Sequence, residues 1–81
     1  MKIKVLFFAR LKDIFGEPSC FVEAPEGACV REVVDRLFET RPGAVLGEIP
    51  LIFAVNENFE PDTRKLEDRD RLAIMTPMSG G

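Results

Sequence analysis

The sequence predicts an α+β roll: a small mixed sheet packed on one main helix, with a short helix after the first strand. Two observations support this prediction. Short strand-like segments surround one strongly amphipathic helical segment, and no other segment has a comparable apolar stripe to cover a sheet. The 81 residues are 46% hydrophobic and 31% charged, which suits a folded domain with one core. We therefore expect a single domain over residues 1–75.

The first strand is predicted over residues 2–9, where lysines alternate with apolar residues in KIKVLF. This is the period of a strand with one buried face. The outward face also becomes apolar at Phe8, and an exposed apolar patch commonly marks a contact surface. A short helix is expected next, because Leu11, Ile14 and Phe15 recur at helical spacing and Gly16 ends the segment.

A second strand is predicted from Ser19, bounded by Pro25 and Gly27. Its connection to the first strand is too long for a tight hairpin. The main helix follows, because apolar residues then recur at i, i+3, i+4, i+7 and i+8. These residues are Val30, Val33, Val34, Leu37 and Phe38, and Pro42-Gly43 marks the end of the helix. Cys29 stands where a Ser or Thr would complete a capping box with Glu32, so we expect the first turn to fray.

The run LIFAV (residues 51–55) has the length and composition of a strand, which we expect at the centre of the sheet. The stretch 56–58 is predicted to be a turn, and the polar stretch 60–71 offers Leu66 as its main anchor. The last strand is predicted over residues 71–75, with Leu72 and Ile74 inward. Pro77 cannot donate a ladder hydrogen bond, so the sheet should release the chain near this residue.

Composition excludes several classes of function. The net charge is −3 with acids and bases interleaved, which argues against a nucleic-acid partner. The apolar run at residues 5–9 is too short for a signal-peptide core or a membrane span, so we expect a cytoplasmic protein without a membrane partner. Cys20 and Cys29 stand nine residues apart and the chain has no His, which favours reduced thiols and no metal site.

The chain closes with MTPMSGG, an uncharged stretch that we expect to form a flexible tail over residues 76–81. Four segments in order are typical of one family: KVLFFARLKDIFG, FAVNE, LEDRDRLAIM and the closing P-x-S-G-G. On these segments the sequence resembles the small subunits of molybdopterin synthases, which are sulfur carriers of the ubiquitin-like β-grasp fold. Two positions depart from the family pattern. Arg69 replaces the usual glycine of Asp-Gly-Asp, and Cys29 replaces a Thr cap.

The resemblance implies a chemical role for the tail. Gly81 would be adenylated by an activating enzyme that uses ATP and Mg²⁺, then converted to a thiocarboxylate that gives sulfur to a cyclic pyranopterin precursor. Pro77, Ser79 and Gly80 would insert with it into the partner. The resemblance also implies that this chain binds no cofactor and is a carrier rather than an enzyme. Its partners would be the large subunit in a heterotetramer, which supplies the catalytic groups, the activating enzyme and a sulfur donor protein.

The outward apolar residues Phe8, Phe59 and Met75 are predicted to form the interface with the large subunit. The alternative is that these three side chains pack under the 56–71 loop. Lys2, Lys4 and Arg10 are interpreted as a solvated face. Three other functions stay open on the sequence: a thiamine-type sulfur carrier, a ubiquitin-like modifier conjugated through Gly81, and an interaction domain with an inert tail.

Overall fold

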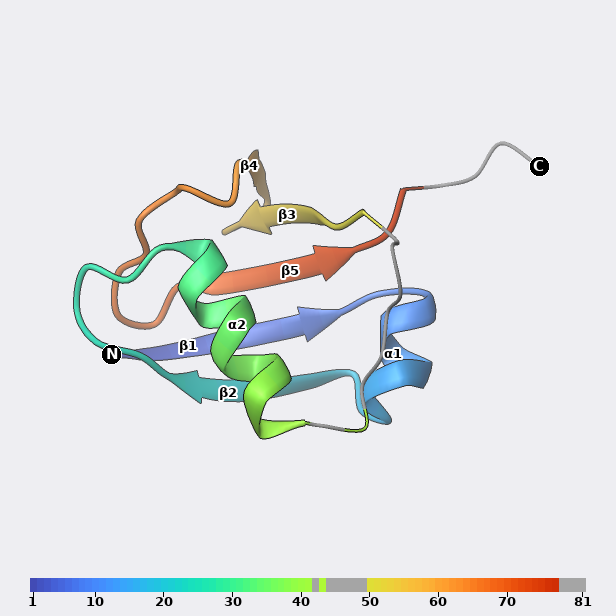
Figure 1. The fold of residues 1–81 in the computed structure, drawn as a ribbon. Coiled ribbons are helices and arrows are strands. Elements are labelled where there is room, and N and C mark those ends of the chain that lie inside the picture. The colour runs from blue at the N-terminus through green and yellow to red at the C-terminus, as the bar shows by residue number, and fades with distance from the viewer. Residues whose placement is uncertain (42, 44–49, 78–81) are drawn as a thin grey trace.

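The computed structural model describes all residues except 42, 44–49 and 78–81. Seven elements follow one another: β1 (Lys2–Phe7), α1 (Arg10–Phe15), β2 (Ser19–Glu23), α2 (Val30–Thr40), β3 (Ile52–Val55), β4 (Asn58–Glu60) and β5 (Arg71–Met75). The strands form one sheet in the order β2-β1-β5-β3-β4, in which β1 and β5 are parallel and the other pairs are antiparallel (Figure 1). The predicted roll with a mixed sheet and one main helix is confirmed.

The core lies between α2 and one face of the sheet, which the helix crosses in Figure 1. Alternate residues of β1 and β5 point into it, as the sequence pattern predicts. Its large, fully buried side chains come from β1, β5 and both helices: Ile3, Val5, Leu11, Val30, Val33, Leu37, Leu72 and Ile74. The polar loop before β5 contributes Leu66, which is 3% exposed and is the anchor that the sequence predicts.

Helix α1 closes one end of this core with stacked aromatic rings. The ring of Phe15 stacks on that of Phe7 with centroids 4.4 Å apart, and Phe38 of α2 packs against Phe15 at 5.3 Å. The left-handed backbone of Gly16 (φ 74°) ends the helix, and its N–H donates to the carbonyl of Lys12. The short helix is therefore fixed mainly by packing, since six residues are too few to be stable alone.

The start of α2 is better held than the sequence predicts. The N–H of Val30 donates to the carbonyl of Arg64, and the N–H of Arg31 donates to the carbonyl of Asp62, both at 2.9 Å. The Glu32 carboxylate accepts a hydrogen bond from the N–H of Cys29 at 3.4 Å. The expectation of a fraying first turn is therefore wrong, because carbonyls of the 60–71 segment satisfy N–H groups that a side-chain cap would otherwise serve.

The region after β3 differs from the sequence prediction in two ways. Residues 58–60 form a strand, β4, and the turn of the hairpin is only Asn56-Glu57. Both turn residues have positive φ (49° and 74°), as a type I′ hairpin turn requires, although neither is glycine. Strand β3 is an interior strand, as the sequence predicts, because it pairs with β5 on one side and β4 on the other, and β5 is the middle strand of the five.

The turn before β5 has the strain expected from the Asp68-Arg69-Asp70 sequence. Arg69 adopts φ 70°, a region that favours glycine. Its N–H donates to the carbonyl of Lys2 at 2.8 Å, and the N–H of Lys2 donates to the Asp68 carboxylate at 2.7 Å. These bonds tie the turn to the start of β1 and so set where β5 begins beside it.

Candidate partner-binding face

The sheet has a second face, which points away from α2 and which we call the open face. The register across the strands arranges its side chains in rows. The residues of one row are apolar except at the β2 end: Ser19, Leu6, Ala73, Ala54 and Phe59. The next row is Phe21, Lys4 and Arg71. The large exposed hydrophobic side chains of the described residues are three phenylalanines, which belong to this face: Phe8, Phe21 and Phe59.

The first row apart from Ser19 lies in a depression of about 270 Å³ that we call the apolar groove. Its apolar lining residues are Leu6, Phe8, Ala54, Phe59, Ala73 and Met75, and Glu57 and Arg71 complete its rim. The groove contains all three residues predicted for the partner interface, drawn from three separate parts of the chain.

Local structure explains how each of the three reaches the groove. Phe59 is 76% exposed at the edge strand β4, where the hairpin turn places it opposite Ala54. Phe8 is 47% exposed just beyond β1, and its N–H donates to the carbonyl of Ile74 at 3.3 Å. Met75 is the last residue of β5. The exposure of Phe59 argues against the alternative that these side chains pack under the 56–71 loop. Their role in a partner interface stays a prediction.

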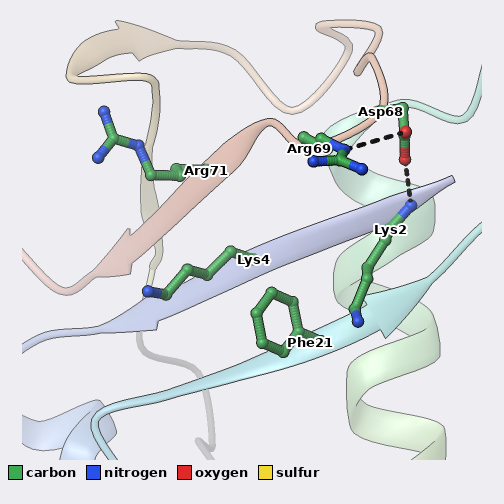
Figure 2. Close-up of a pocket in the computed structure, with 6 residues that line it drawn as sticks. All are labelled: Lys2, Lys4, Phe21, Asp68, Arg69 and Arg71. Atoms are coloured by element: carbon green, nitrogen blue, oxygen red, sulfur yellow. Dashed lines mark hydrogen bonds and ion pairs between the residues drawn. The ribbon is translucent and has the colours of Figure 1, made fainter.

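A second depression, of about 450 Å³, adjoins the groove, and we call it the basic hollow (Figure 2). It is lined by Lys2, Lys4, Phe21, Asp68, Arg69 and Arg71. Sequence reasoning missed this cluster, because its members come from β1, β2 and the start of β5. The available signal was the alternation in SCFVE, which places Phe21 outward beside the lysines of β1.

A buried carboxylate holds the Arg71 end of this face in place. Asp70 is 8% exposed, and its carboxylate accepts hydrogen bonds from the Asn56 side-chain amide (2.9 Å) and the N–H of Glu67 (2.8 Å). The side-chain oxygen of Asn56 in turn accepts from the N–H of Arg71 at 3.0 Å. The β3–β4 hairpin is thereby fixed to the beginning of β5, and this keeps Phe59 and Arg71 on the same face.

Most of the residues predicted to take part in the tail chemistry fall in the last four positions of the chain. Ser79, Gly80 and Gly81 lie outside the described residues. Pro77 is exposed, two residues beyond the end of β5. The chain therefore leaves the sheet beside the apolar groove, because Met75 both ends β5 and lines the groove.

The described residues offer little catalytic chemistry of their own. No group of three or more His, Cys, Asp or Glu side chains converges among them in a way that could hold a metal ion. Burial raises the pKa of the Cys20 thiol, an effect that the nearby Arg41 guanidinium partly offsets, so this thiol stays protonated and weakly nucleophilic at neutral pH. No helix in the described part of the chain is long and apolar enough to cross a membrane.

A mixed sheet crossed by one helix, with the other face open, is the architecture of ubiquitin-like β-grasp proteins. The solved structure of small archaeal modifier protein 1 from Haloferax volcanii superimposes with a TM-score of 0.84 over 100% of both chains, at 21% identity. This likeness confirms the predicted fold class.

The chain belongs to the ThiS family, whose model matches residues 5–81. It is 33% identical over 81 residues to the molybdopterin synthase sulfur carrier subunit of Arabidopsis thaliana, covering 100% of this chain and 84% of the relative. The protein of the same name in Chlamydomonas reinhardtii is 30% identical over 83 residues, with 100% of both chains covered. The resemblance to molybdopterin synthase small subunits is thereby confirmed.

Proposed function

We propose that this chain is the sulfur carrier of a molybdopterin synthase and that Gly81 carries the sulfur. The observation that supports this most strongly is the likeness to carriers of that name along the whole chain, in a family match that runs through Gly81. The described structure agrees with it, because β5 ends next to an exposed apolar groove that a partner could cover.

The chemistry explains why the acyl group has to be activated. A carboxylate is a poor electrophile, so one oxygen of Gly81 first attacks the α-phosphorus of ATP and pyrophosphate leaves. The terminal sulfur of a persulfide on a donor protein then displaces AMP from the acyl adenylate and gives an acyl disulfide. A thiol cleaves that disulfide, which releases the thiocarboxylate and leaves a new disulfide on the donor side. ATP and Mg²⁺ belong to the activating enzyme. Glycine suits both steps because it has no Cβ to crowd the carbonyl carbon or the backbone in a narrow channel.

Docking on the open face would place the tail in the partner. The groove formed by Phe8, Phe59 and Met75 would hold the large subunit, while Pro77, Ser79 and Gly80 lead Gly81 into its active site. Six residues in extended form reach about 20 Å, which is long enough to enter another protein. The tail has no charged side chain, so the terminal group is the one charge that must be desolvated on entry.

The acid and base groups for sulfur transfer would come from the large subunit. This chain contains no His, and its Cys20 thiol has a raised pKa, so it offers no evident base or activated nucleophile. We therefore assign it the role of a carrier, and its likeness to synthase subunits favours a cytoplasmic heterotetramer with the large subunit. The pyranopterin precursor would bind to the large subunit.

Deletion of Gly81 tests this function. Synthase activity reconstituted with the large subunit and the activating enzyme should be lost, while the circular dichroism spectrum and unfolding midpoint stay unchanged. A Met78→Leu variant keeps the length and both glycines of the tail, and it should stay active. Appending one bulky residue after Gly81 should also abolish activity. Full activity of the deletion or the extension would overturn the proposal.

A further inference from the structure

The basic hollow is positively charged, although the protein as a whole is negatively charged. The whole chain has 14 acidic and 11 basic residues and a net charge of −3. The hollow, in contrast, is lined by four basic side chains and one acidic one. Like charges gathered on one patch repel each other, so a cluster of this kind costs stability unless a ligand or partner neutralises it.

Within the part of the chain that the structure describes, three of the four cations form no ion pair with a carboxylate. Within 4 Å, Asp68 pairs only with Arg69 in the hollow, and at a long 3.8 Å. Among the described residues, no carboxylate forms an ion pair with the ammonium groups of Lys2 and Lys4 or with the guanidinium of Arg71. Figure 2 shows these side chains arranged along the strands, with Asp68 at one end of the cluster.

An exposed aromatic ring lies among these cations. Phe21 is 61% exposed, and the ammonium group of Lys2 lies 4.5 Å from the centre of its ring. The register places Phe21 directly across from Lys4. Aromatic residues and arginine are enriched in protein interfaces, whereas lysine is typical of their polar rim. Phe21 and Arg71 therefore suit a contact region, and the two lysines suit the charged rim around it.

The hollow is continuous with the apolar groove. Arg71 lines both depressions, and the row that contains Lys4 and Arg71 is next to the row that contains Leu6 and Ala73. A protein that covers the groove therefore lies within reach of the basic side chains. This continuity favours one occupant for both depressions.

We propose that the basic hollow binds a carboxylate-rich surface of the large subunit, next to the site where that subunit covers the apolar groove. This inference rests on the proposed function and adds the charge pattern of the partner. The cations would accelerate encounter and fix the orientation in which the groove docks, because complementary charges raise association rates and disfavour wrong registers.

Other ligands fit the hollow less well. A nucleic acid would meet the net negative charge of the whole protein and the carboxylate of Asp68. A small phosphate-like anion calls for donors that converge on one point, whereas these cations are spread over β1 and the region from residue 69 to residue 71. A protein surface with several carboxylates matches a spread of this kind.

The test is the rate of association between this chain and the large subunit encoded in the same genome, followed by stopped-flow fluorescence. The variant Lys2→Glu/Lys4→Glu reverses two cations that line the hollow but not the groove. The control Lys12→Glu/Arg36→Glu changes the net charge equally on exposed positions of α1 and α2. Circular dichroism verifies that both variants are folded, and Lys2→Gln/Lys4→Gln provides a milder change.

We expect the Lys2/Lys4 reversal to slow association about tenfold or more at low salt, and the control to have a much smaller effect. The difference should shrink between about 0.05 M and about 0.5 M ionic strength, and the glutamine variant should lie between wild type and reversal. Equal rates for reversal and control would overturn the inference while leaving the proposed function intact. Failure of the wild type to bind the large subunit would overturn both.

A small-anion site gives a different result. In an NMR titration with inorganic phosphate, saturable shifts at Lys2, Lys4, Arg69 and Arg71 would indicate such a site. Combined with equal association rates for reversal and control, these shifts would reassign the hollow to a small anion and overturn the proposal. Weak, unsaturable shifts together with the salt-dependent rate effect would support it.

Discussion

The two faces of the sheet use the same strands for opposite purposes. On the face that α2 covers, Ile3 and Val5 of β1 are completely buried. On the open face, Lys4 and Leu6 of the same strand line the basic hollow and the apolar groove. Alternation along one strand therefore supplies a core on one side and, on the other, the surface that we propose docks the partner. The contrast predicts that stability and partner binding can be changed separately.

The largest effect should come from the covered face. Leu37 of α2 is 1% exposed, so Leu37→Ala removes buried methyl groups and leaves a cavity beneath the helix. We expect the free energy of unfolding to fall by about 2–5 kcal/mol, as measured by urea denaturation. Affinity for the large subunit, corrected for the folded fraction, should stay unchanged. A large loss of affinity in the folded fraction would show that the two faces are coupled.

The reverse behaviour is expected on the open face. Phe59 is 76% exposed on the edge strand β4, so Phe59→Asp should change stability by less than about 1 kcal/mol. In the proposed complex it places a charge in an apolar contact, and we expect binding to weaken by about 2 kcal/mol or more, roughly 30-fold. Isothermal titration calorimetry with the large subunit measures this. Phe8→Asp and Met75→Asp should act in the same way, and unchanged binding in all three variants would remove the groove from the interface.

Asp70 connects the two faces, because it is buried and also holds the hairpin that carries Phe59. In Asp70→Ala, the Asn56 amide and the Glu67 N–H lose their acceptor. Hydrogen bonds to a charged group contribute about 1.5–3 kcal/mol, so we expect a loss of about 2 kcal/mol in stability. The control Asp62→Ala removes a 3.7 Å ion pair between exposed side chains and should cost less than about 1 kcal/mol. Equal losses in the two variants would contradict this account of Asp70.

The smallest effect concerns the turn before β5. Arg69 has φ 70° and its side chain is 89% exposed, so Arg69→Gly removes backbone strain and little contact. A left-handed conformation costs an ordinary residue about 1–2 kcal/mol, and part of this is offset by the greater freedom of glycine in the unfolded chain. We expect a net gain of about 0.5 kcal/mol. The unfolding midpoint in urea measures it, and a decrease would show that the arginine side chain stabilises the turn.

The sequence predicted the covered face better than the open one. Helix α2 and the inward residues Leu72 and Ile74 follow from periodicity, because burial imposes a regular pattern on the chain. Strand β4 is not predicted because it has only three residues, two of which are polar. The hairpin turn before it also lacks the usual signal, since its two residues adopt positive φ although neither is glycine. The start of α2 was misjudged because its hydrogen-bond acceptors lie about 30 residues further along the chain, at Asp62 and Arg64.

The candidate site shows the same limit of sequence reasoning. The apolar residues Phe8, Phe59 and Met75 stand out singly as exposed hydrophobic residues, and the structure brings them into one groove. Alternation alone places the lysines of β1 and Phe21 on outward faces, but their meeting with Arg71 in one hollow depends on strand order and register, which the sequence does not show. The parallel pairing of β1 with β5 places Arg71 beside Lys4, and antiparallel pairing with β2 adds Phe21.

The most direct test of the central claim is the intact mass of this chain purified from its own cells under non-reducing conditions. A sulfur carrier, whether for molybdopterin or thiamine, should contain a fraction heavier by the difference between one sulfur and one oxygen atom, located at Gly81 by fragmentation. That fraction should rise when the large subunit is absent and vanish when the activating enzyme is absent. Covalent conjugates to lysines of other proteins in place of this fraction would indicate a modifier, and an unmodified Gly81 under all conditions would contradict the account.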